Sequence, residues 1–323
     1  MSRIIWANTK LADTAAQRLR EGTSGHRLMF SSSSSASVLV GGKSDPLLAE
    51  AEIAFGQPAV DDCFRYGNLR WIELSSAGYT RYDREDLKDV LRQRGTIVTN
   101  ASSVFADSCA QHVLAMMLSL SRQLPQSHRD QLTDRSWHYL ERRYHSRRLA
   151  GQTVLLLGYG AIGRRLAELL APFGLKLLAF RRQARSEAAV RVIAAEHISS
   201  ALAEADHVVN LLPENDATVD FVNARRLACC KRGAHFYNVG RGTTVDQRAL
   251  AEALHSGRLG AAYLDVTVPE PLPSDDPLWT TPNCFITPHT AGGRHDQDDA
   301  LAEHFLANLA AYERGDPLTD RVI

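Results

Sequence analysis

The sequence predicts an α/β protein made of two doubly wound parallel-sheet domains. Short apolar runs alternate with amphipathic segments along most of the 323 residues, as expected where a covering helix follows each strand. A chain of this length is sufficient for two domains with separate hydrophobic cores. One long amphipathic segment, SSVFADSCAQHVLAMMLSLSRQL from residue 102, separates two series of apolar runs. We expect the chain to pass from one domain to the other along this helix.

The first domain is expected to be discontinuous, with bounds 1–103 plus 291–323. Its expected strands include ASVLVG, EIAFG, LRWIEL and GTIVTN, and its expected helices DPLLAEA and DREDLKDVLRQRG. The tract SSSSSA is expected to be a solvated loop or the frayed start of a strand. The last amphipathic segment, DDALAEHFLANLAAYERG, is expected to return to this domain as a helix.

The second domain is expected to cover residues 104–290. Its expected strands are TVLLLGYG, LKLLAF, HVVNLL, AHFYNV, GAAYLDV and CFITPH. The helix DQRALAEALHSG is expected to begin at Asp246, whose carboxylate can cap it. The polar, basic stretch HRDQLTDRSWHYLERRYHSRRLAG is expected to be a solvated connector or a subunit contact.

Composition excludes several classes of function. The 37 Lys and Arg residues balance 37 Asp and Glu residues, so no overall field favours nucleic acid or an anionic membrane surface. No signal-peptide core is evident and no stretch approaches about 18 apolar residues, so we expect a cytoplasmic protein. The five cysteines lack CxxC spacing and are expected to be free thiols. No HExxH or paired Cys/His spacing occurs, so no metal is expected.

The segment LLLGYGAIGRRLAELL predicts a dinucleotide cradle and makes its domain Rossmann-like. Gly158, Gly160 and Gly163 lie between an apolar strand and an amphipathic helix, where they allow a tight turn and a close approach of backbone to a pyrophosphate. The alternative is an ordinary structural turn. The predicted cofactor-binding residues of this turn are Gly158, Tyr159, Gly160, Ala161, Ile162 and Gly163.

The next strand ends in Arg181 and Arg182, where many dinucleotide-binding folds place a carboxylate. A carboxylate there would repel a ribose 2′-phosphate, whereas a guanidinium can donate a forked pair of hydrogen bonds to it. We therefore predict that NADP(H) is the preferred cofactor, with NAD(H) as the alternative. The competing interpretation is that both arginines are solvated at the end of a strand.

Three further stretches, NVGRGTTVD, AAYLDVTVPEPLP and TPHTAGG, follow the glycine turn in order. With them the chain, from about residue 70 to 315, resembles the D-isomer-specific 2-hydroxyacid dehydrogenases, which include glyoxylate/hydroxypyruvate reductases. The resemblance implies that Arg241 holds the substrate carboxylate and keto oxygen, since its guanidinium has the matching fork geometry. It implies that His289 is the acid/base and that Glu270 hydrogen-bonds the imidazole and favours its protonated form.

The resemblance also implies a second set of contacts. Asp265 is placed near the nicotinamide end of the cofactor, and Leu212 and Pro213 are included among the cofactor-binding residues. The stretch LSSAGYT matches the loop whose backbone amides face the substrate carboxylate, which assigns Ser76, Ala77 and Gly78 to substrate binding. The alternative for this loop is an ordinary strand-to-helix turn.

Two departures from the family pattern bear on substrate choice. Ser76 stands where phosphoglycerate dehydrogenases usually carry an arginine, which argues for an unphosphorylated substrate. Gln111 stands where glutamate is usual, with no predicted consequence. Trp137 and Trp279 are candidates for a wall of the cleft or a subunit contact, although aromatic side chains are more often buried in packing.

The sequence therefore predicts an NADPH-preferring oxidoreductase that reduces a small 2-keto acid, similar to glyoxylate or hydroxypyruvate, to the D-2-hydroxy acid. The resemblance implies a homodimer. One alternative is a cofactor-sensing binding protein of the corepressor type, which would bind the dinucleotide without turnover. Another is an enzyme similar to phosphoglycerate dehydrogenase.

Overall fold

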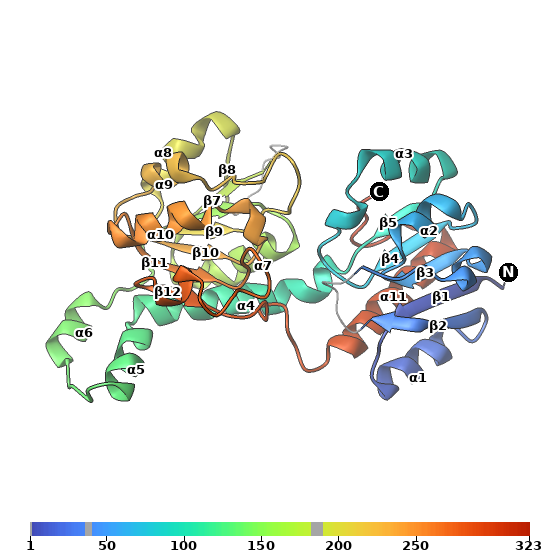
Figure 1. Ribbon diagram of the computed structural model, residues 1–323, viewed down its shortest axis with the longest axis horizontal. Helices are drawn as coiled ribbons and strands as arrows, with labels where there is room; N and C mark the ends of the chain where they lie inside the picture. The colour runs from blue at the N-terminus through green and yellow to red at the C-terminus, as the bar shows by residue number, and fades with distance from the viewer. Residues whose placement is uncertain (1, 36–40, 182–189) are drawn as a thin grey trace. The chain divides into compact units, whose positions relative to one another are not determined.

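The chain divides into two compact units, which the computed structural model describes over residues 2–35, 41–181 and 190–323 (Figure 1). One unit consists of Met1–Phe105 with Arg294–Ile323, and the other of Ala106–Gly293. Each has its own sheet of parallel strands with helices packed against it. The predicted α/β class with two doubly wound parallel sheets is confirmed.

In the first unit, the described residues form a five-stranded parallel sheet in the order β2-β1-β3-β4-β5. The strands are β1 (Ile4–Thr9), β2 (Arg27–Ser35), β3 (Ile53–Gly56), β4 (Trp71–Leu74) and β5 (Ile97–Thr99). The helices are α1 (Asp13–Gly22), α2 (Val60–Arg65), α3 (Glu85–Arg94), α11 (Gln297–Arg314) and the 3₁₀ segments η1 (Pro46–Glu50) and η2 (Thr80–Tyr82).

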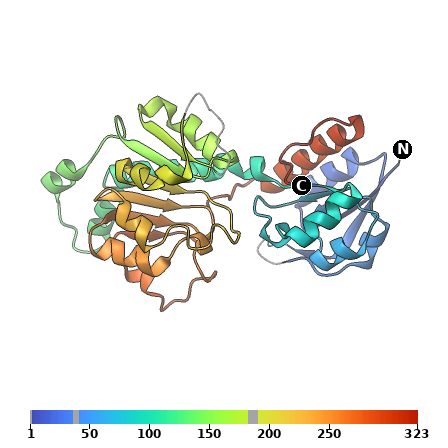
Figure 2. The same cartoon turned by 90° about the horizontal axis from the view of Figure 1, so that it is seen from above.

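Helices cover both faces of this sheet, as Figure 2 shows for α1 and α11 on one face and α2 and α3 on the other. The C-terminal helix α11 belongs to this unit because its aromatic side chains stack on the strands. The ring of Phe305 lies 4.6 Å from that of Phe55 and 5.2 Å from that of Trp71. All three side chains are fully buried, so α11 forms part of the core.

Two expectations for the first unit are wrong. The serine tract is neither a loop nor the start of a strand: it forms the end of β2, which runs from Arg27 through Ser35 and pairs in parallel with β1. Backbone hydrogen bonds to β1 hold this tract in the sheet, and such bonds do not require hydrophobic side chains. The segment DPLLAEA forms a short 3₁₀ helix capped by Asp45, with Pro46 in its first turn, rather than an α-helix. Residues 36–40 of the expected strand ASVLVG lie outside the described residues.

In the second unit, the described residues form a seven-stranded parallel sheet in the order β12-β11-β10-β9-β6-β7-β8. The strands are β6 (Thr153–Leu157), β7 (Lys176–Phe180), β8 (Arg191–Ile193), β9 (His207–Asn210), β10 (Ala234–Asn238), β11 (Leu259–Leu264) and β12 (Cys284–Ile286). The helices are α5 (Leu124–Leu132), α6 (Tyr139–His145), α7 (Ala161–Leu170), α8 (Ile198–Glu204), α9 (Ala224–Cys229), α10 (Gln247–His255) and the 3₁₀ segments η3 (Ala171–Phe173), η4 (Ala195–His197), η5 (Gly242–Thr244) and η6 (Pro277–Thr280).

The order of strands in this sheet reverses at β6. The chain adds β7 and β8 on one side of β6 and then returns to place β9 on the other side. The carboxyl ends of β6 and β9 therefore form a topological switch point, which is where open α/β sheets bind ligands. The glycine turn follows β6 directly, so the fold places it at this point.

The predicted cap of α10 is confirmed, whereas β8, α5 and α6 were not expected. The Asp246 carboxylate accepts a hydrogen bond of 3.0 Å from the Ala249 amide, as predicted. Strand β8 was not predicted, and the expected polar connector instead contains α5 and α6. These two helices project away from the sheet of their unit (Figure 1), and Trp137 between them is 92% exposed. A core position for Trp137 is therefore excluded.

Helix α4 (Ser102–Ser121) contains the unit boundary at Phe105. Contrary to the sequence-based expectation, its length and composition are sufficient for a membrane span, with a mean hydropathy of 1.2 over its most apolar 18 residues. One such helix is weak evidence, because core helices of globular domains pass the same test. Val113 and Met117 are fully buried, as in a core helix. All five cysteines are free thiols.

Candidate functional site

The turn between β6 and α7 is a tight loop whose glycines are required by contacts with neighbouring backbone. Gly158 has φ +103°, a conformation that L side chains rarely adopt. A Cβ added at Gly163 would lie 2.9 Å from the Gly158 carbonyl oxygen, so α7 could not pack as closely against the turn. At Gly160, by contrast, an added Cβ would meet no protein atom within 4 Å. Packing within the protein therefore does not explain why residue 160 is a glycine.

A dinucleotide fits this geometry. Gly160 is the N-cap of α7, and its own side chain, a hydrogen, leaves open space in front of the first helical turn. The backbone amides of Ala161 and Ile162 lie in that turn, where unsatisfied N–H groups and the helix dipole favour a phosphate. Backbone approach to a pyrophosphate would account for Gly160, so the residues present fit the predicted cofactor.

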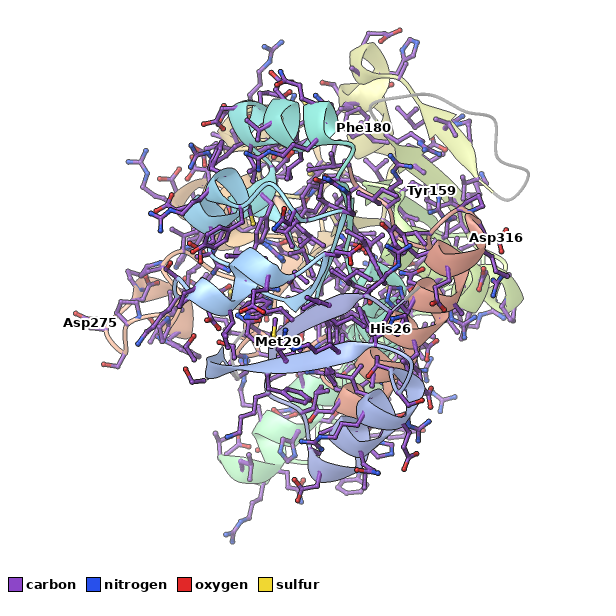
Figure 3. The ribbon with its side chains drawn as sticks, turned by 90° about the vertical axis from the view of Figure 1, so that its right-hand side faces the viewer. His26, Met29, Tyr159, Phe180, Asp275 and Asp316 are labelled. Atoms are coloured by element: carbon purple, nitrogen blue, oxygen red, sulfur yellow. The ribbon has the colours of Figure 1, made fainter. Side chains whose placement is uncertain are left out.

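The end of β7 lies next to the glycine turn, because the Gly158 amide donates a 2.9 Å hydrogen bond to the Phe180 carbonyl. Figure 3 labels Tyr159 in the turn and Phe180 at the end of this strand. Arg181 follows Phe180 immediately and is half-buried. Its guanidinium is thus carried one residue beyond a strand end that is bonded to the cradle. Arg182 lies outside the described residues.

An aromatic and cationic stack that the sequence did not indicate lies next to the end of β7, where Arg181 follows. The ring of Phe180 stacks on that of Phe221 at 5.4 Å, and the Arg226 guanidinium lies 3.9 Å from the centroid of the Phe221 ring. Phe221 lies in the segment between β9 and α9, which is remote from β7 in sequence. These residues come together only through the order of the strands in the folded sheet, so no local motif could have indicated the stack.

The loop after β10, which contains NVGRG, is packed against the end of β9. The Asn210 side chain donates hydrogen bonds to the Asn238 and Thr244 side chains at 3.0 and 2.7 Å. A Cβ added at Gly240 would lie 2.7 Å from the Leu212 carbonyl oxygen, which shows how closely the two segments approach. The structure thus brings the predicted residue Leu212 beside the arginine loop. Pro213 follows it and is exposed.

Arg241 is the cation of this loop and is half-buried. Its guanidinium donates a 2.7 Å hydrogen bond to the Gly240 carbonyl, which restricts its direction. Burial lowers the pKa of Arg241, while the nearby carboxylates of Glu270 and Glu214 oppose that shift. Even with this shift an arginine stays charged at neutral pH, so the site contains a partly desolvated cation suited to a carboxylate.

Glu270 and His289 form a hydrogen-bonded pair, with 2.8 Å between Glu270 Oε2 and His289 Nδ1. The other carboxylate oxygen of Glu270 accepts a 3.1 Å bond from the Thr267 amide. Burial raises the pKa of Glu270, but the hydrogen bond and charge of His289 outweigh burial, and the net pKa lies below its usual value. Glu270 is therefore anionic at neutral pH. His289 Nε2 is directed away from the pair.

Asp265 holds the loop that carries His289. Its carboxylate accepts bonds from the Thr290 and Ala291 amides, both at 2.9 Å, and from the Thr287 hydroxyl at 2.5 Å. Its carbonyl oxygen accepts a 2.8 Å bond from the His289 amide. His289 adopts a positive φ of 53°, which is unusual for a residue other than glycine. The buried Asp265 therefore maintains the backbone conformation at His289.

A polar chain from α4 reaches the same loop and was not predicted. His112 Nε2 is hydrogen-bonded to the Tyr263 hydroxyl, which is hydrogen-bonded to the Thr287 hydroxyl. Burial lowers the pKa of His112, and the nearby Asp265 only partly opposes this. His112 and Tyr263 are 151 positions apart, so sequence spacing could not have joined them. Gln111, the neighbouring departure from the family pattern, donates to Asp107 at 2.6 Å.

The predicted substrate loop, Ser76 to Gly78, belongs to the first unit and follows β4. Its three carbonyl oxygens accept hydrogen bonds from other groups: that of Ser76 from the Ala101 amide, that of Ala77 from the Asn100 side chain, and that of Gly78 from the Ser76 hydroxyl. Among the described residues, the Ser76, Ala77 and Gly78 amides have no protein partner. Such a run of unpaired N–H groups suits an anion.

No cluster of three or more His, Cys, Asp or Glu side chains that could hold a metal ion occurs in residues 2–35, 41–181 and 190–323. The remaining predicted aromatic residue, Trp279, is about half exposed, and its indole N–H donates a 2.8 Å hydrogen bond to the Pro273 carbonyl. It lies in η6, which follows the PEPLP segment.

Comparisons with known proteins agree with this arrangement. Residues 114–291 match the family described as D-isomer specific 2-hydroxyacid dehydrogenase, NAD binding domain. The human glyoxylate reductase/hydroxypyruvate reductase is 33% identical over 256 residues, which cover 78% of this chain and 76% of the human protein. A glyoxylate reductase of Korarchaeum cryptofilum is 31% identical over 242 residues, covering 73% and 71% of the two chains.

The fold is also similar to that of solved structures. A D-isomer specific 2-hydroxyacid dehydrogenase from Xanthobacter autotrophicus Py2, solved in complex with NADPH and MES, superimposes with a TM-score of 0.83 at 29% identity. The alignment covers 100% of this chain and 98% of that chain.

Proposed function

The chain belongs to the D-isomer specific 2-hydroxyacid dehydrogenases and is an NAD(P)-dependent oxidoreductase. From this premise we propose that it is an NADPH-preferring reductase of a small 2-keto acid. The substrate class is that of glyoxylate and hydroxypyruvate, and the product is the D-2-hydroxy acid. The observation that carries the proposal is the 2.8 Å pair of Glu270 and His289, which lies near the half-buried cation Arg241.

His289 is the proton donor of the proposed reaction. Its Nδ1 is engaged by Glu270, which leaves Nε2 for the substrate oxygen. The reduced nicotinamide, when bound, supplies a hydride to the keto carbon. The carbonyl electron pair then moves to oxygen, and His289 Nε2 delivers a proton to it. The anionic Glu270 stabilises the imidazolium before transfer and fixes the ring so that Nε2 stays directed at the substrate.

In this proposal Arg241 of the second unit binds the substrate anion. A guanidinium can donate two parallel hydrogen bonds to a carboxylate, or one each to carboxylate and keto oxygen. Arg241 thereby orients the substrate and polarises its carbonyl group. The loop of the first unit, Ser76 to Gly78, is assigned to substrate binding because its amides have no partner among the described residues, and Ser76 adds no positive charge for a phosphate. This absence of charge favours a substrate without a phosphate group.

The preference for NADPH is assigned to Arg181. Its position one residue after the Phe180 carbonyl, which is bonded to Gly158, corresponds to the ribose end of a cofactor seated at the glycine turn. A cation there attracts a 2′-phosphate, whereas the usual carboxylate would repel it. The related Xanthobacter protein was solved with NADPH, which supports the same choice here.

We also propose a homodimer formed through the second unit. Large apolar side chains are concentrated at exposed positions of α5, α6 and the segment between them: Leu124, Leu132, Trp137, Tyr139, Leu140 and Tyr144. An exposed apolar surface of this kind is typical of a subunit contact. Light scattering on the purified protein should therefore give twice the mass of one chain, and a monomer would contradict this part of the proposal.

The experiment that tests the proposed function measures loss of NADPH absorbance with a panel of 2-keto acids. Glyoxylate, hydroxypyruvate, pyruvate and phosphohydroxypyruvate are supplied in turn at equal concentration. The proposal predicts turnover with glyoxylate or hydroxypyruvate and much weaker turnover with the phosphorylated acid. Tight NADPH binding without turnover of any acid would contradict a reductase and would fit a cofactor sensor.

A further inference from the structure

The loop of Ser76, Ala77 and Gly78 is maintained by a hydrogen-bonded relay that begins at Gln57, the residue directly after β3. The side-chain amide of Gln57 donates a 3.0 Å hydrogen bond to the Ser76 hydroxyl, and that hydroxyl donates a 2.6 Å bond to the Gly78 carbonyl. The hydroxyl of Ser76 is thus directed back into the protein. The hydroxyl accepts a hydrogen bond from Gln57 and donates one to Gly78, so it links the first residue of the loop to the last.

Gln57 is itself fixed at the switch point of the first sheet. The strand order reverses at β1, so the carboxyl ends of β1 and β3 lie side by side. There the Asn8 side chain bonds the backbone of Gln57 twice, accepting from its amide at 2.7 Å and donating to its carbonyl at 2.9 Å. A Cβ at Gly56 would lie 2.1 Å from the Asn8 side-chain oxygen, so only glycine permits this approach.

The relay is buried, and this determines its energetic weight. Asn8, Gln57 and Ser76 are 1%, 4% and 6% exposed. Water cannot replace a lost partner at such positions without cost, and a buried amide or hydroxyl without a partner destabilises any conformation that leaves it unpaired. Hydrogen bonds in series also polarise one another in a medium of low dielectric. The relay therefore defines one conformation of the loop.

That conformation directs the loop's donors outward. The Gly78 carbonyl is held by the relay, the Ala77 carbonyl by Asn100 at 2.7 Å, and the Ser76 carbonyl by the Ala101 amide at 3.0 Å. With every carbonyl bonded within the protein, the negative ends of these peptide dipoles are removed from the ligand side. What remains for a ligand is the set of N–H groups.

We propose that Gln57 and the Ser76 hydroxyl are positioning residues for the substrate carboxylate, acting through the Ser76–Gly78 backbone and not by contact with the substrate. This role rests on the proposed function, to which it adds two residues that position the substrate-binding loop. Loss of the relay frees the Gly78 carbonyl to turn toward the anion. Substrate and transition state lose the same interaction, because both retain the carboxylate, so the loss appears in KM and not in kcat.

The test uses Gln57→Met, which keeps the length of the side chain without its amide, and Ser76→Ala. We expect each variant to raise KM for glyoxylate about fivefold or more, the equivalent of one net hydrogen bond. The expected kcat stays within about twofold of the parent protein, and NADPH affinity, measured by nicotinamide fluorescence, is unchanged. The double variant should match the single ones, because either change already breaks the relay.

Thr96→Val is the matched control for a structural effect. The Thr96 hydroxyl is buried in the same unit and donates a 2.7 Å bond to the Leu69 carbonyl, outside the relay. The control should lower Tm without raising KM. The inference is overturned if Thr96→Val raises KM as Gln57→Met does, if Ser76→Ala leaves KM unchanged, or if the two single effects multiply in the double variant. Lack of keto-acid turnover in the parent protein would instead contradict the proposed function.

Discussion

At the residue scale, the candidate site depends on which charges are paired and which are left for ligands. Glu270 is committed to His289, and Asp265 to the backbone of the same loop. Arg241 is a partly desolvated cation near this pair. In the part of the chain that the structure describes, its guanidinium hydrogen-bonds only to the Gly240 carbonyl. In the proposed function an anionic substrate would therefore meet Arg241 as a cation and His289 as the proton donor, because the two carboxylates are engaged elsewhere.

Arg181 gives the first prediction at this scale. Arg181→Asp should lower kcat/KM for NADPH by about tenfold or more and relatively favour NADH, because a carboxylate repels the 2′-phosphate that the guanidinium would bind. The measurement is kcat/KM for both cofactors with one keto acid.

Arg191→Asp is the control for Arg181. Arg191 lies in β8, pairs with Glu204 at 2.8 Å and is exposed, so its replacement should leave the cofactor ratio unchanged. An unchanged ratio in Arg181→Asp would place the phosphate contact elsewhere, with Arg182 as the first candidate.

At the element scale, the β6–α7 turn separates packing from ligand binding. Gly163→Ala should reduce stability, because the new methyl group meets the Gly158 carbonyl. Gly160→Ala should leave Tm within about 2 °C, because its methyl group has open space, and yet should weaken NADPH binding at least about tenfold by blocking the pyrophosphate. Calorimetry and fluorescence titration measure the two quantities. If Gly160→Ala bound NADPH normally, the pyrophosphate would not contact this turn.

The same scale shows what the sequence could predict. The glycine turn, the strand before it and the cap of α10 depend on neighbouring residues, and local pattern indicated them correctly. The serine strand β2 was missed because backbone pairing with β1 decides it, not side-chain hydrophobicity. Strand β8 has only three residues, which is too short for a periodic signal.

The candidate site follows the same division. Arg241, Glu270 and His289 lie in short motifs that the chain shares with the family it resembles, so the resemblance could name them from sequence. The chain of His112, Tyr263 and Thr287 joins α4, β11 and the loop after β12. The relay of Gln57 and Ser76 joins the loop after β3 to the loop after β4. Such contacts form only when the order of strands in the sheet brings separate segments together, and the spacing of residues in a sequence motif does not predict that order.

At the scale of the whole molecule, buried histidines make the two units respond to opposite extremes of pH. In the second unit, burial lowers the pKa of His207 to about 3 and that of His235 to about 4. Their rings are 5.5 Å apart, and each charged ring would repel the other. In the first unit, burial lowers the pKa of His304, but hydrogen bonds and charge from Asp320 and Glu73 outweigh it and raise the value to about 9.

The sign of each effect follows from linkage. His207 and His235 bind protons more weakly in the folded state than in the unfolded state, where the value is 6.5, so stability is lost as pH falls from 6.5 toward 4. At pH 5 the loss is on the order of 2 kcal/mol for each histidine. His304 binds its proton more tightly when folded, so its contribution is complete below pH 6.5 and is lost as pH rises through about 9.

Urea unfolding at pH 5, 7 and 9 measures both effects. We expect His235→Gln to reduce the loss of unfolding free energy between pH 7 and 5 while leaving the change between pH 7 and 9 as in the parent protein. His304→Gln should do the reverse, so each variant is the control for the other. Equal pH dependence in the parent protein and both variants would show that other groups control stability.

The most direct test of the central claim is the rate of NADPH oxidation by His289→Ala with the best keto acid from the panel. If His289 donates the proton, kcat falls by about two to four orders of magnitude, the usual contribution of a positioned acid/base, while NADPH affinity is unchanged. Near-parental kcat in this variant, with the cofactor bound normally, would contradict proton donation by His289 and with it the proposed mechanism.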